Sequence, residues 1–483
     1  MKRATAVAVS GGGHSMKAAL LLKAQRHHVI GIHFICQRKY FLKVPKYTIT
    51  TLGCKVNQYE SEAIARELET SEWHPAQKNE PADLCIVNTC TVTQKASMQS
   101  RQAVRQAIRA NPNARIVVAG CYAQTAAEEI KKIDGVHDVI GHAQKHKIAS
   151  IFRSPKPNET LHQISVCSNI RKEHQFRRFS ETVYGTRTRP FLKIQDGCDS
   201  FCAYCIVPFA RGPSRSMSLT DVLENIKQLG AVGYHEVVLT GVHLGNYGLD
   251  LDPKTSLNEL LSAIDESNLI KRVRLSSIEP LELTDDIIAC VAESRRFCRH
   301  FHIPLQSGDD QILKKMHRPY SGSYFRDLVF KINKRLPDAA IGVDVLVGFP
   351  GETDKAFENT YNLIQDLSVA YLHVFPFSSR AGTAASKLAD KIPSDVIKER
   401  GQRMRKLGAD YRLRFFNGFI GQTLEVLIEE TRDKKSGLLK AISSNYIPVL
   451  IDASDDYMNH IVQVTVEKLD KNNRPYGTIF SSG

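Results

Sequence analysis

The chain has 483 residues, of which 42% are hydrophobic, so it is long enough for about three domains with buried cores. Its formal net charge of +14 suggests an anionic partner such as a nucleic acid, although a basic surface also aids solubility. No apolar run approaches the roughly 20 residues that span a bilayer, and no secretory signal follows Lys2 and Arg3, so we expect a cytoplasmic protein without membrane contact. In that compartment its 11 cysteines indicate metal or redox chemistry rather than disulfides.

Residues 1–46 contain the segment SGGGHS between an apolar stretch and a helical pattern. Glycines between a strand and a helix can cradle a phosphate. The stretch resembles the opening of tRNA-thiolating PP-loop enzymes, whose motif is S-G-G-x-D-S, but His14 stands where that motif has its acidic residue. So short a segment cannot form the nucleotide domain, so we expect a degenerate extension that does not bind ATP.

From residue 47 the pattern alternates strands and helices and predicts a small α/β domain over 47–152 with a parallel sheet. Residues 153–189 predict a basic linker with interleaved aromatic residues. A second α/β series over 190–415 has six strand–helix units, which predicts a (β/α)6 barrel with functional loops at the carboxyl ends of its strands. Short β runs from 416 to 483 predict a small β-barrel. The strands are expected at 47–54, 83–90, 114–123, 138–141, 191–195, 236–242, 272–280, 300–307, 342–352, 371–378, 423–430, 437–444, 446–452 and 461–470. The helices are expected at 61–73, 95–110, 126–133 and 218–230, from 256, from 283, up to 334, at 355–367 and at 385–415.

Three cysteines follow the first barrel strand in the pattern C-x3-C-x2-C: Cys198, Cys202 and Cys205. Thiolates at this spacing suit an iron–sulfur cluster or zinc. Closed zinc sites have four protein ligands, and here the fourth is missing. The alternatives are zinc with a distant fourth ligand, or plain reduced cysteines. A [4Fe–4S] cluster with three thiolates would leave one iron open for a ligand.

This loop, with Tyr204 before the last cysteine and a (β/α)6 barrel behind it, resembles the radical SAM superfamily. The resemblance implies that S-adenosylmethionine fills the open iron position through its amino and carboxylate groups. It also implies that the bound molecule is cleaved to a 5′-deoxyadenosyl radical. The protein would then position the reactants and exclude water.

Three further cysteines, Cys54, Cys90 and Cys121, each end an apolar strand in the first α/β domain. A parallel sheet could bring them together, although scattered cysteines are more often small buried hydrophobes. Their motifs TLGCKVNQYES, NTCTVT and GCYAQ resemble the N-terminal domain of radical SAM methylthiotransferases. That resemblance spans about residues 47–480, includes a C-terminal TRAM module, and implies a second [4Fe–4S] cluster on these cysteines. The remaining cysteines match no motif and are expected to be structural: Cys36, Cys85, Cys167, Cys290 and Cys298.

Candidate residues for binding S-adenosylmethionine stand at the ends of the barrel strands. Gly241 could let the backbone approach the methionine end of the ligand, or could be a plain turn glycine. Only the resemblance supports individual roles. The residues expected to bind this cofactor are Tyr204, Thr240, Gly241, Ser277, Gln306 and Gly348.

The resemblance implies replacement of a C–H bond by C–SCH3, with tRNA as the expected substrate. LGCKVNQYES is similar to the branch acting on N6-threonylcarbamoyladenosine at tRNA position 37, whereas the isopentenyladenosine branch tends to carry Q-M-N and the ribosomal-protein branch P-K-N after the first cysteine. Basic residues of the linker and the C-terminal barrel are expected to contact phosphates, or to form an ordinary solvated surface. These residues are Arg177, Arg178, Arg432, Lys434, Lys435 and Lys440.

The leading hypothesis is therefore a monomeric tRNA methylthiotransferase that receives electrons from a protein such as flavodoxin or ferredoxin. The alternatives are a methylthiotransferase for isopentenyladenosine or a ribosomal-protein aspartate, and a non-catalytic RNA-binding protein that uses its cysteines to bind zinc.

Overall fold

The structure is a computed structural model, and it describes residues 44–152, 165–179, 185 and 187–480. The chain divides into two units, Met1–Val44 and Pro45–Gly483, and the description below concerns the second. The predicted PP-loop-like extension and part of the predicted linker lie outside the described residues.

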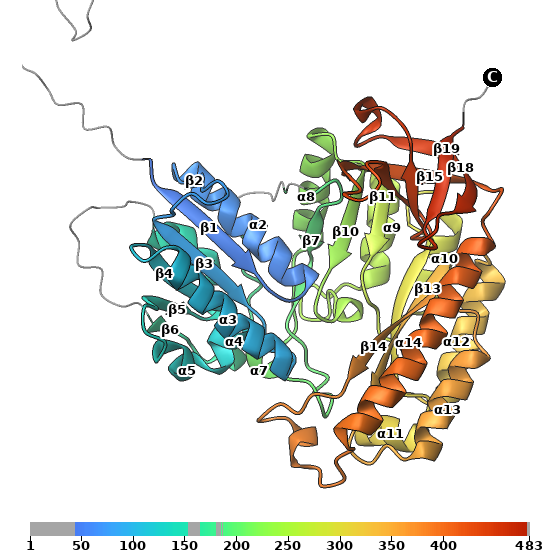
Figure 1. The fold of residues 1–483 in the computed structure, drawn as a ribbon, viewed down its shortest axis with the longest axis horizontal. Helices are drawn as coiled ribbons and strands as arrows, with labels where there is room; N and C mark the ends of the chain where they lie inside the picture. Colours follow the sequence, from blue (N-terminus) through green and yellow to red (C-terminus); the bar gives the residue numbers. More distant parts are fainter. Residues whose placement is uncertain (1–43, 153–164, 180–184, 186, 481–483) are drawn as a thin grey trace, which may run out of the picture. The chain divides into compact units, whose positions relative to one another are not determined.

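The N-terminal domain is built on a six-stranded sheet in the order β2-β1-β3-β4-β5-β6, with all neighbours parallel. Every residue of β3 (Leu84–Thr89) is buried, as expected for a parallel strand covered on both faces. The parallel sheet expected from the sequence is therefore present (Figure 1). Its other elements are β1 (Lys46–Thr51), β2 (His74–Pro75), β4 (Arg115–Gly120), β5 (Asp138–Ile140), β6 (Ser165–Val166), α2 (Lys55–Thr70), α3 (Gln94–Ala110), α4 (Cys121–Thr125), α5 (Ala127–Lys131), η1 (His142–Lys147) and α6 (Ile148–Ile151).

Helix α2 begins earlier than the sequence predicts, at Lys55 rather than near Ser61. No side chain caps it, because Cys54 occupies the cap position in an extended conformation without a capping hydrogen bond. The first turn is held instead by burial: Val56 and Tyr59, three residues apart, are on the buried face. Cys54 therefore lies at the N-cap of α2, and Lys55 is the first residue of the helix.

The second domain has six parallel strands in two three-stranded sheets, β7-β10-β11 and β12-β13-β14. An isolated parallel bridge between Ser277 and His302 joins the two, so the strands follow one another in chain order around a partial barrel, as predicted. The strands are β7 (Phe191–Lys193), β10 (Glu236–Thr240), β11 (Arg272–Leu275), β12 (His300–Gln306), β13 (Ala340–Val347) and β14 (Tyr371–Pro376), with a short antiparallel pair β8 (Gln195–Asp196) and β9 (Arg215–Ser216).

Helices follow the barrel strands, and several begin with side-chain caps. Ser256 makes a complete capping box with Glu259 at the start of α9, and Ser218 accepts a hydrogen bond from the Asp221 N–H at the start of α8. The helices and 3-10 turns are α7 (Val207–Arg211), α8 (Leu219–Ala231), η3 (Leu244–Asn246), α9 (Leu257–Ser267), α10 (Asp285–Glu293), α11 (Asp310–Lys315), α12 (Gly322–Arg335), α13 (Asp354–Gln365), η4 (Ala384–Lys387) and α14 (Ser394–Asn417).

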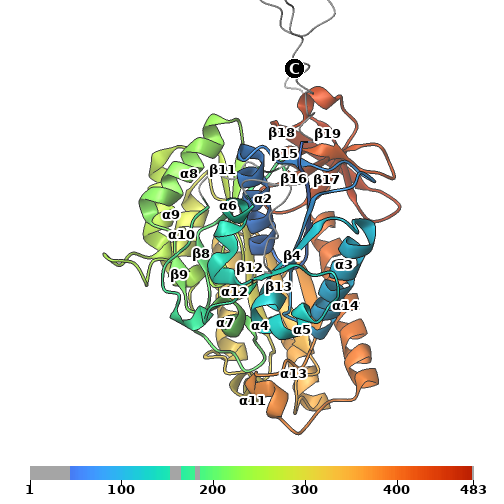
Figure 2. The ribbon, with the colours of Figure 1, turned by 90° about the vertical axis from the view of Figure 1, so that its left-hand side faces the viewer.

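The chain ends in a closed five-stranded barrel in the order β15-β16-β17-β19-β18, which confirms the predicted C-terminal β-barrel. This barrel, drawn in red, follows α14 in both views (Figure 1, Figure 2). Val426, Ile428 and Val464 are among its fully buried core residues. Its elements are β15 (Thr423–Arg432), β16 (Leu439–Ser443), β17 (Pro448–Ile451), η5 (Asp455–Tyr457), β18 (Ile461–Leu469) and β19 (Pro475–Ile479).

The described part of the predicted linker is more ordered than a linker. Strand β6 extends the N-terminal sheet, and η2 (Ile170–Lys172) follows it. Phe179 is buried and meets Tyr59 of α2 edge-on, with ring centroids 6.3 Å apart. Phe176 packs against the same core. Phe176 and Phe179 therefore pack against the core that the N-terminal domain and the partial barrel share.

The N-terminal domain and the partial barrel share a hydrophobic core, to which Tyr59, Ile64 and Leu68 of α2 and Leu192 of β7 contribute. A separate core lies under α3 and α5, with Val104 and Ile130 among its residues. Among the described residues, no helix combines the length and the apolar character needed to cross a bilayer.

Candidate functional site

The first cysteine cluster lies between β8 and α7, after the first barrel strand. Cys198, Cys202 and Cys205 are partly buried. The loop turns at Phe201, whose φ of 44° lies in the left-handed region, and the Cys205 N–H donates to the Cys202 carbonyl at 2.9 Å. Each of the three thiols lies within electrostatic reach of the other two. The structure thus brings together the three residues that the spacing predicts.

The thiol pKa values indicate what this cluster can bind. Burial, with the charges of Cys202 and Cys198, raises the pKa of Cys205 to about 12, and burial also raises the pKa of Cys202. Burial acts in the same direction on Cys198, but the adjacent His243 lowers the pKa of that thiol. Without a positive charge, three neighbouring thiolates in this environment are unfavourable. Metal ions supply that charge and draw out the thiolates. The donor set therefore fits an iron–sulfur cluster.

Two cationic side chains stand against this cluster. His243, in the loop after β10, lies with Nδ1 3.3 Å from Cys198 Sγ and bonds to Glu282 through Nε2. Burial alone would lower the pKa of His243, but these two partners raise it to about 10. Arg318, after α11, donates from Nη1 to Cys202 Sγ at 3.2 Å and pairs with Glu279. Such outer partners orient metal-binding thiolates and tune their charge.

The second group of cysteines stands at the carboxyl ends of three neighbouring strands. Cys54 follows β1, Cys90 follows β3, and Cys121 follows β4. Gly53 allows the first two segments to approach, because a Cβ at Gly53 would lie 2.9 Å from Cys90 Cβ and 3.0 Å from its Sγ. Burial, with smaller effects from Cys90 and Cys54, raises the pKa of Cys121 to about 12. The sheet therefore gathers three thiols separated widely in sequence.

Polar groups fix the segments around this second group. Asn57 donates from Nδ2 to the Leu52 and Thr89 carbonyls at 2.7 and 3.0 Å, which ties α2 to two strand ends. His142 Nε2 lies 3.3 Å from Cys121 Sγ. Burial keeps the pKa of His142 well below its usual range, so it stands there as a neutral imidazole. Cys54, Cys90 and Cys121 therefore form a second group of thiols, and Asn57 and His142 hold the segments around it in place.

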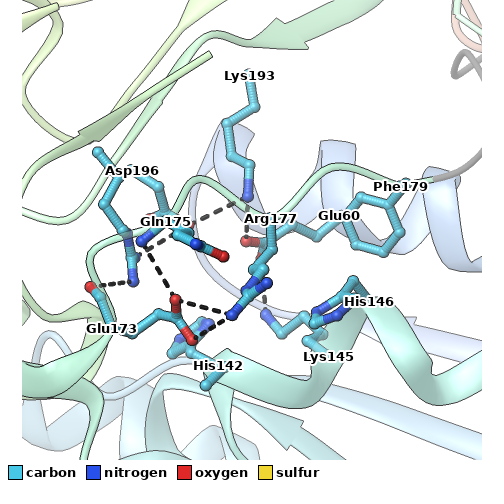
Figure 3. Close-up of a pocket in the computed structure, with 12 residues that line it drawn as sticks. Glu60, His142, Lys145, His146, Glu173, Gln175, Arg177, Phe179, Lys193 and Asp196 are labelled. Carbon is cyan, nitrogen blue, oxygen red and sulfur yellow. Dashed lines mark hydrogen bonds and ion pairs between the residues drawn. The ribbon is translucent and has the colours of Figure 1, made fainter. Parts of the chain in front are cut away.

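A buried network of charges lies between the two cysteine groups. Glu60 of α2 accepts hydrogen bonds from Lys145, Lys193 and Arg211 at 2.6 to 3.1 Å, and Arg211 also donates to Asp196 at 2.7 Å. Figure 3 shows Glu60, Lys145, Lys193 and Asp196 around a cavity of about 20 Å³, roughly the space for one water.

This network contacts residues that directly precede both cysteine groups in the sequence. Asp196 precedes the C-x3-C-x2-C loop by two residues and accepts from the Gly197 N–H at 2.9 Å. Lys145 donates to Asn88 of β3 at 3.1 Å, close before Cys90. The sequence did not predict this network, because its charges are far apart in the chain and nothing in their local pattern marks them as buried.

The interior of the partial barrel carries a polar cluster that the sequence also missed. His302 Nε2 lies 2.7 Å from Asp344 Oδ1, and His373 Nδ1 lies 3.3 Å from the same oxygen. Ser277 Oγ lies 3.0 Å from His302 Nδ1. The ligand atoms of the two histidines and the aspartate lie within 4.8 Å of one another. The two histidines both bind the Asp344 carboxylate. His302, Asp344 and His373 therefore form a polar wall on the adjacent strands β12, β13 and β14.

Lys55 extends this polar interior from the N-terminal domain. Burial, with the neighbouring charges of Arg274 and Arg189, lowers the pKa of Lys55 to about 8. Asp344 and Cys54 act in the opposite direction. Lys55 therefore lies close enough to the barrel interior for the charges there to shift its pKa. It is also the residue next to Cys54 in the sequence.

The residues predicted to bind S-adenosylmethionine all stand at or beyond the carboxyl ends of barrel strands. Thr240 is buried, and a Cβ at Gly241 would lie 2.9 Å from Gln195 Oε1, so this backbone is closely approached. Gln306 and Gly348 adopt positive φ values of 65° and 79°. Ser277 is exposed next to His302.

Tyr204, which is one of the residues predicted to bind S-adenosylmethionine, and Glu352 have structural roles. Tyr204 packs against the apolar cluster around Met316 and Phe349, so its ring anchors the cysteine loop to the barrel. Glu352 accepts the Gly348 N–H at 3.0 Å and pairs with Arg400, so it fixes the turn at Gly348. Thr353 caps α13.

The predicted tRNA-binding residues differ in how free they are. Arg177 and Arg178 are about half exposed, and pair with Glu173 and Asp221. Arg432 is engaged within the C-terminal barrel, where it binds Asp455 and the Gly437 and Ala453 carbonyls.

The three predicted tRNA-binding lysines also differ in whether they are paired with a carboxylate. Lys440 lies 3.5 Å from Glu429. Lys434 and Lys435 are exposed, and neither side chain pairs with another described residue. They remain the freest of the predicted phosphate contacts.

The cysteines without a motif stay apart from both groups. Cys85 and Cys298 are buried, Cys290 packs partly against the main core, and Cys167 donates weakly to the Ala123 carbonyl at 3.6 Å. Cys36 lies outside the described residues. His243 and Arg318 were missed as site residues, although His243 lies only two residues after Gly241.

Comparisons with known proteins agree with this site. Residues 46–141 match the family model described as "Uncharacterized protein family UPF0004", and residues 192–364 match the "Radical SAM superfamily". Among solved structures, the chain resembles the radical S-adenosylmethionine methyltransferase TsrM from Kitasatospora setae. Its TM-score is 0.50 at 16% identity over 69% of this chain and 73% of that chain, which shows a shared fold. The fold and the cysteine loop thus define a radical SAM enzyme.

Curated relatives narrow this class. The threonylcarbamoyladenosine tRNA methylthiotransferases MtaB of Bacillus subtilis and Aquifex aeolicus are 38% and 35% identical over 86% and 84% of this chain, and 93% and 96% of their own length. A tRNA-2-methylthio-N(6)-dimethylallyladenosine synthase of Clostridium botulinum (strain Okra / Type B1) is 32% identical over 88% of this chain and 95% of its own length. The chain belongs to the radical SAM tRNA methylthiotransferases, which are transferases that use S-adenosylmethionine and a [4Fe–4S] cluster.

Proposed function

We propose that this chain converts N6-threonylcarbamoyladenosine at position 37 of tRNA to its 2-methylthio derivative with the help of two iron–sulfur clusters. The observation that carries the two-cluster part is the presence of two separate groups of three thiols, one in the first barrel loop and one at three neighbouring strand ends of the N-terminal sheet. The substrate is supported by the relatives from Bacillus subtilis and Aquifex aeolicus, and by the segment LGCKVNQYES around Cys54.

In this proposal, Cys198, Cys202 and Cys205 hold the cluster that binds S-adenosylmethionine, and Cys54, Cys90 and Cys121 hold the second cluster. When bound, these groups supply the radical and the methylated sulfur that together replace C–H by C–SCH3. The domain 47–152 would carry sulfur, the barrel 190–415 would carry radical chemistry, and 416–483 would bind tRNA. Electrons would come from a flavodoxin- or ferredoxin-like donor.

The chain's own residues orient and shield the reactants. His243 contacts the sulfur of Cys198 and Arg318 donates to the sulfur of Cys202, and both contacts hold the loop in place. Tyr204 and its apolar neighbours close one side of the loop against water. We assign Thr240, Gly241, Ser277, Gln306 and Gly348 to binding of S-adenosylmethionine, because each stands at the carboxyl end of a barrel strand.

Affinity for tRNA is assigned to exposed basic residues outside the barrel interior. Phosphate contacts of this kind give salt-dependent binding without reading the sequence. Lys434 and Lys435 are the first candidates, with Arg177, Arg178 and Lys440 able to exchange their present carboxylate partners for phosphates. Arg432 is assigned to stability of the C-terminal barrel instead.

Mass spectrometry of tRNA nucleosides from a strain that lacks this gene tests the substrate. We expect loss of 2-methylthio-N6-threonylcarbamoyladenosine, accumulation of its unmethylthiolated precursor, and recovery on complementation. A second candidate, isopentenyladenosine, is favoured only by the Clostridium botulinum relative. Loss of the methylthio-isopentenyl nucleoside with the threonylcarbamoyl product intact would replace our proposal by that candidate.

A further inference from the structure

A pocket of about 290 Å³ lies beside the barrel interior, where three parts of the chain meet. Lys55 of α2, Arg189 ahead of β7, Arg274 of β11 and Tyr446 of the C-terminal barrel contribute to its lining. Val238 and Arg274 are register partners on adjacent strands β10 and β11, so both point to the same face of the sheet. The pocket is therefore an extension of the face that carries the polar wall of the barrel, within reach of the Cys54 segment.

The lining is strongly cationic. Five basic residues line the pocket, namely Lys55, Arg187, Arg189, Arg274 and Lys440, against the two carboxylates Glu429 and Glu430. A cavity with this excess of positive charge attracts anions.

Most of these cations are already satisfied. Arg274 donates to Glu236 and to the Ser443 and Ser444 carbonyls at 2.8 to 3.0 Å. Arg187 binds Glu62 at 2.8 Å.

Both oxygens of Glu429 are also taken. Arg189 Nη2 lies 2.9 Å from Oε1, and Lys440 Nζ lies 3.5 Å from Oε2. Glu429 is therefore already shared by two cations of the lining.

Two hydrogen-bond donors in the pocket lining, Lys55 Nζ and Arg189 Nε, lack a partner among the described residues. Lys55 Nζ forms no hydrogen bond or ion pair with the described residues, although it is partly buried beside two arginines. Arg189 Nε is buried, and it has no hydrogen-bond partner within the described chain. A partly desolvated ammonium and an unpaired guanidinium N–H are unfavourable unless an anion completes them.

We propose that this pocket binds the carboxylate of the substituent on N6 of the target adenosine, with Lys55 and Arg189 as its donors. The inference rests on the proposed function, because that substituent carries a carboxylate only in the threonylcarbamoyl nucleoside. Phe191, Val238 and Tyr446 supply apolar surface for the carbon atoms of the substituent, and Thr188 and Thr431 supply hydroxyl groups at its edge. The volume is near the lower end, about 300 Å³, of small-molecule sites.

Lys55 is thereby a specificity residue. A neutral hydrophobic substituent would leave the ammonium unpaired, whereas a carboxylate would pair with it. Sites built to bind a polar group discriminate strongly against analogues that lack it, because their own buried donors are left unsatisfied. A phosphate of the RNA backbone is the other source of an anion, and the experiment below separates the two.

The test compares three anticodon stem-loop RNAs, with the reconstituted full-length enzyme. One carries N6-threonylcarbamoyladenosine, the second carries its neutral carboxamide, and the third carries unmodified adenosine. Initial rates of methylthio product and RNA affinity are measured for wild type, Lys55→Gln and Arg189→Gln. Lys227→Gln is the control, because it removes an exposed lysine of α8 outside the pocket.

We expect wild type and Lys227→Gln to prefer the carboxylate RNA over the carboxamide by at least about tenfold in kcat/KM, since one charged hydrogen bond contributes about that factor. Lys55→Gln and Arg189→Gln should each lose most of this preference. Both should retain the iron content and the S-adenosylmethionine cleavage of wild type. Retained iron content and cleavage show that the lost carboxylate preference is a defect of substrate recognition. Arg189→Gln is included because Lys55→Gln alone could act by disturbing the adjacent Cys54.

The inference is overturned if wild type treats carboxylate and carboxamide RNAs alike, or if both variants keep the wild-type preference. Weaker binding of all three RNAs by the same factor would assign the pocket to a backbone phosphate and also overturn it. Failure of the proposed function is a different result: wild type would form no product on the threonylcarbamoyl RNA while still cleaving S-adenosylmethionine.

Discussion

Arg211 donates from Nη1 to Asp196 Oδ1 at 2.7 Å, and this contact joins the start of the barrel's cysteine loop to a helix at its end. The same guanidinium reaches Glu60 and Asn57 of α2 at 3.1 and 2.5 Å. All of these side chains are buried. One arginine therefore connects the two domains that carry the two cysteine groups.

Replacement of Arg211 by Met should destabilise the protein strongly, because it leaves Glu60 and Asp196 with fewer cations in a buried site. Breaking a buried ion pair on one side costs about 3–5 kcal/mol. For a unit of about 440 residues that corresponds to a fall in apparent Tm of roughly 3–5 °C. Thermal unfolding measured in parallel on Arg326→Met gives the control, because Arg326 is exposed and pairs with its neighbour Asp327. Equal Tm values for the two variants would contradict the structural role of Arg211.

A second buried carboxylate predicts a pH dependence. Burial alone would raise the pKa of Glu236, but Arg274, Arg272 and Arg189 lower it to about 2. A lowered folded-state pKa means that the stabilisation is present above the unfolded value near 4.5 and is lost as the pH falls toward 2. Its size is about 3 kcal/mol at neutral pH.

Glu236→Gln should therefore lower the Tm at pH 7, and the gap to wild type should narrow steadily between pH 5 and pH 2. Thermal scans across that range, with both proteins in the same cluster-free state, measure the gap. A gap that stays constant down to pH 2 would show that Glu236 is not held ionised by the arginines.

The C-terminal barrel allows a test of tRNA binding by point variants. Removal of 418–483 would also uncover Arg274, which donates to the Ser443 and Ser444 carbonyls of this barrel, so deletion confounds binding with stability. The double change Lys434→Gln and Lys435→Gln affects only exposed side chains. If each lysine contacts one phosphate, the slope of log affinity against log salt should fall by about 1.5. Binding measured over a salt series gives the slope, and an unchanged slope refutes the assignment.

How far the sequence predicted this molecule depends on whether the signal is local. The C-x3-C-x2-C loop and the six barrel strands carry short-range patterns, so Cys198 and its neighbours were predicted together with their place after the first strand. Cys54 and Cys121 needed the sheet to bring them together, and local spacing left them ambiguous. The start of α2 was misplaced because no capping residue marks it.

The remaining site residues depend on tertiary contacts that no pattern encodes. His302, Asp344 and His373 sit on three different strands, and each alone is an ordinary polar residue in a strand. Arg432 was assigned to tRNA from its charge, although its carboxylate and carbonyl partners occupy its guanidinium. Charge along the chain predicts a basic surface but not which of its cations are free.

Iron analysis addresses the two metal sites separately. The reconstituted protein should contain about eight iron atoms, with four in each [4Fe–4S] cluster. Cys198→Ala should remove one cluster and Cys90→Ala the other, because the thiols belong to separate groups. Cys85→Ala, a buried cysteine outside both groups, is the control and should keep the full iron content. Loss of both clusters from either single change, or zinc as the native metal, would contradict the two-site arrangement.

The most direct test of the central claim separates radical formation from sulfur insertion. A triple variant with Cys54, Cys90 and Cys121 changed to Ala is reduced with dithionite and given S-adenosylmethionine and tRNA that carries N6-threonylcarbamoyladenosine. Our account predicts that it releases 5′-deoxyadenosine and forms no methylthio nucleoside, whereas the triple Ala variant at Cys198, Cys202 and Cys205 forms neither product. Methylthio nucleoside from the first variant would contradict the account, because sulfur insertion would then proceed without the upstream cysteines.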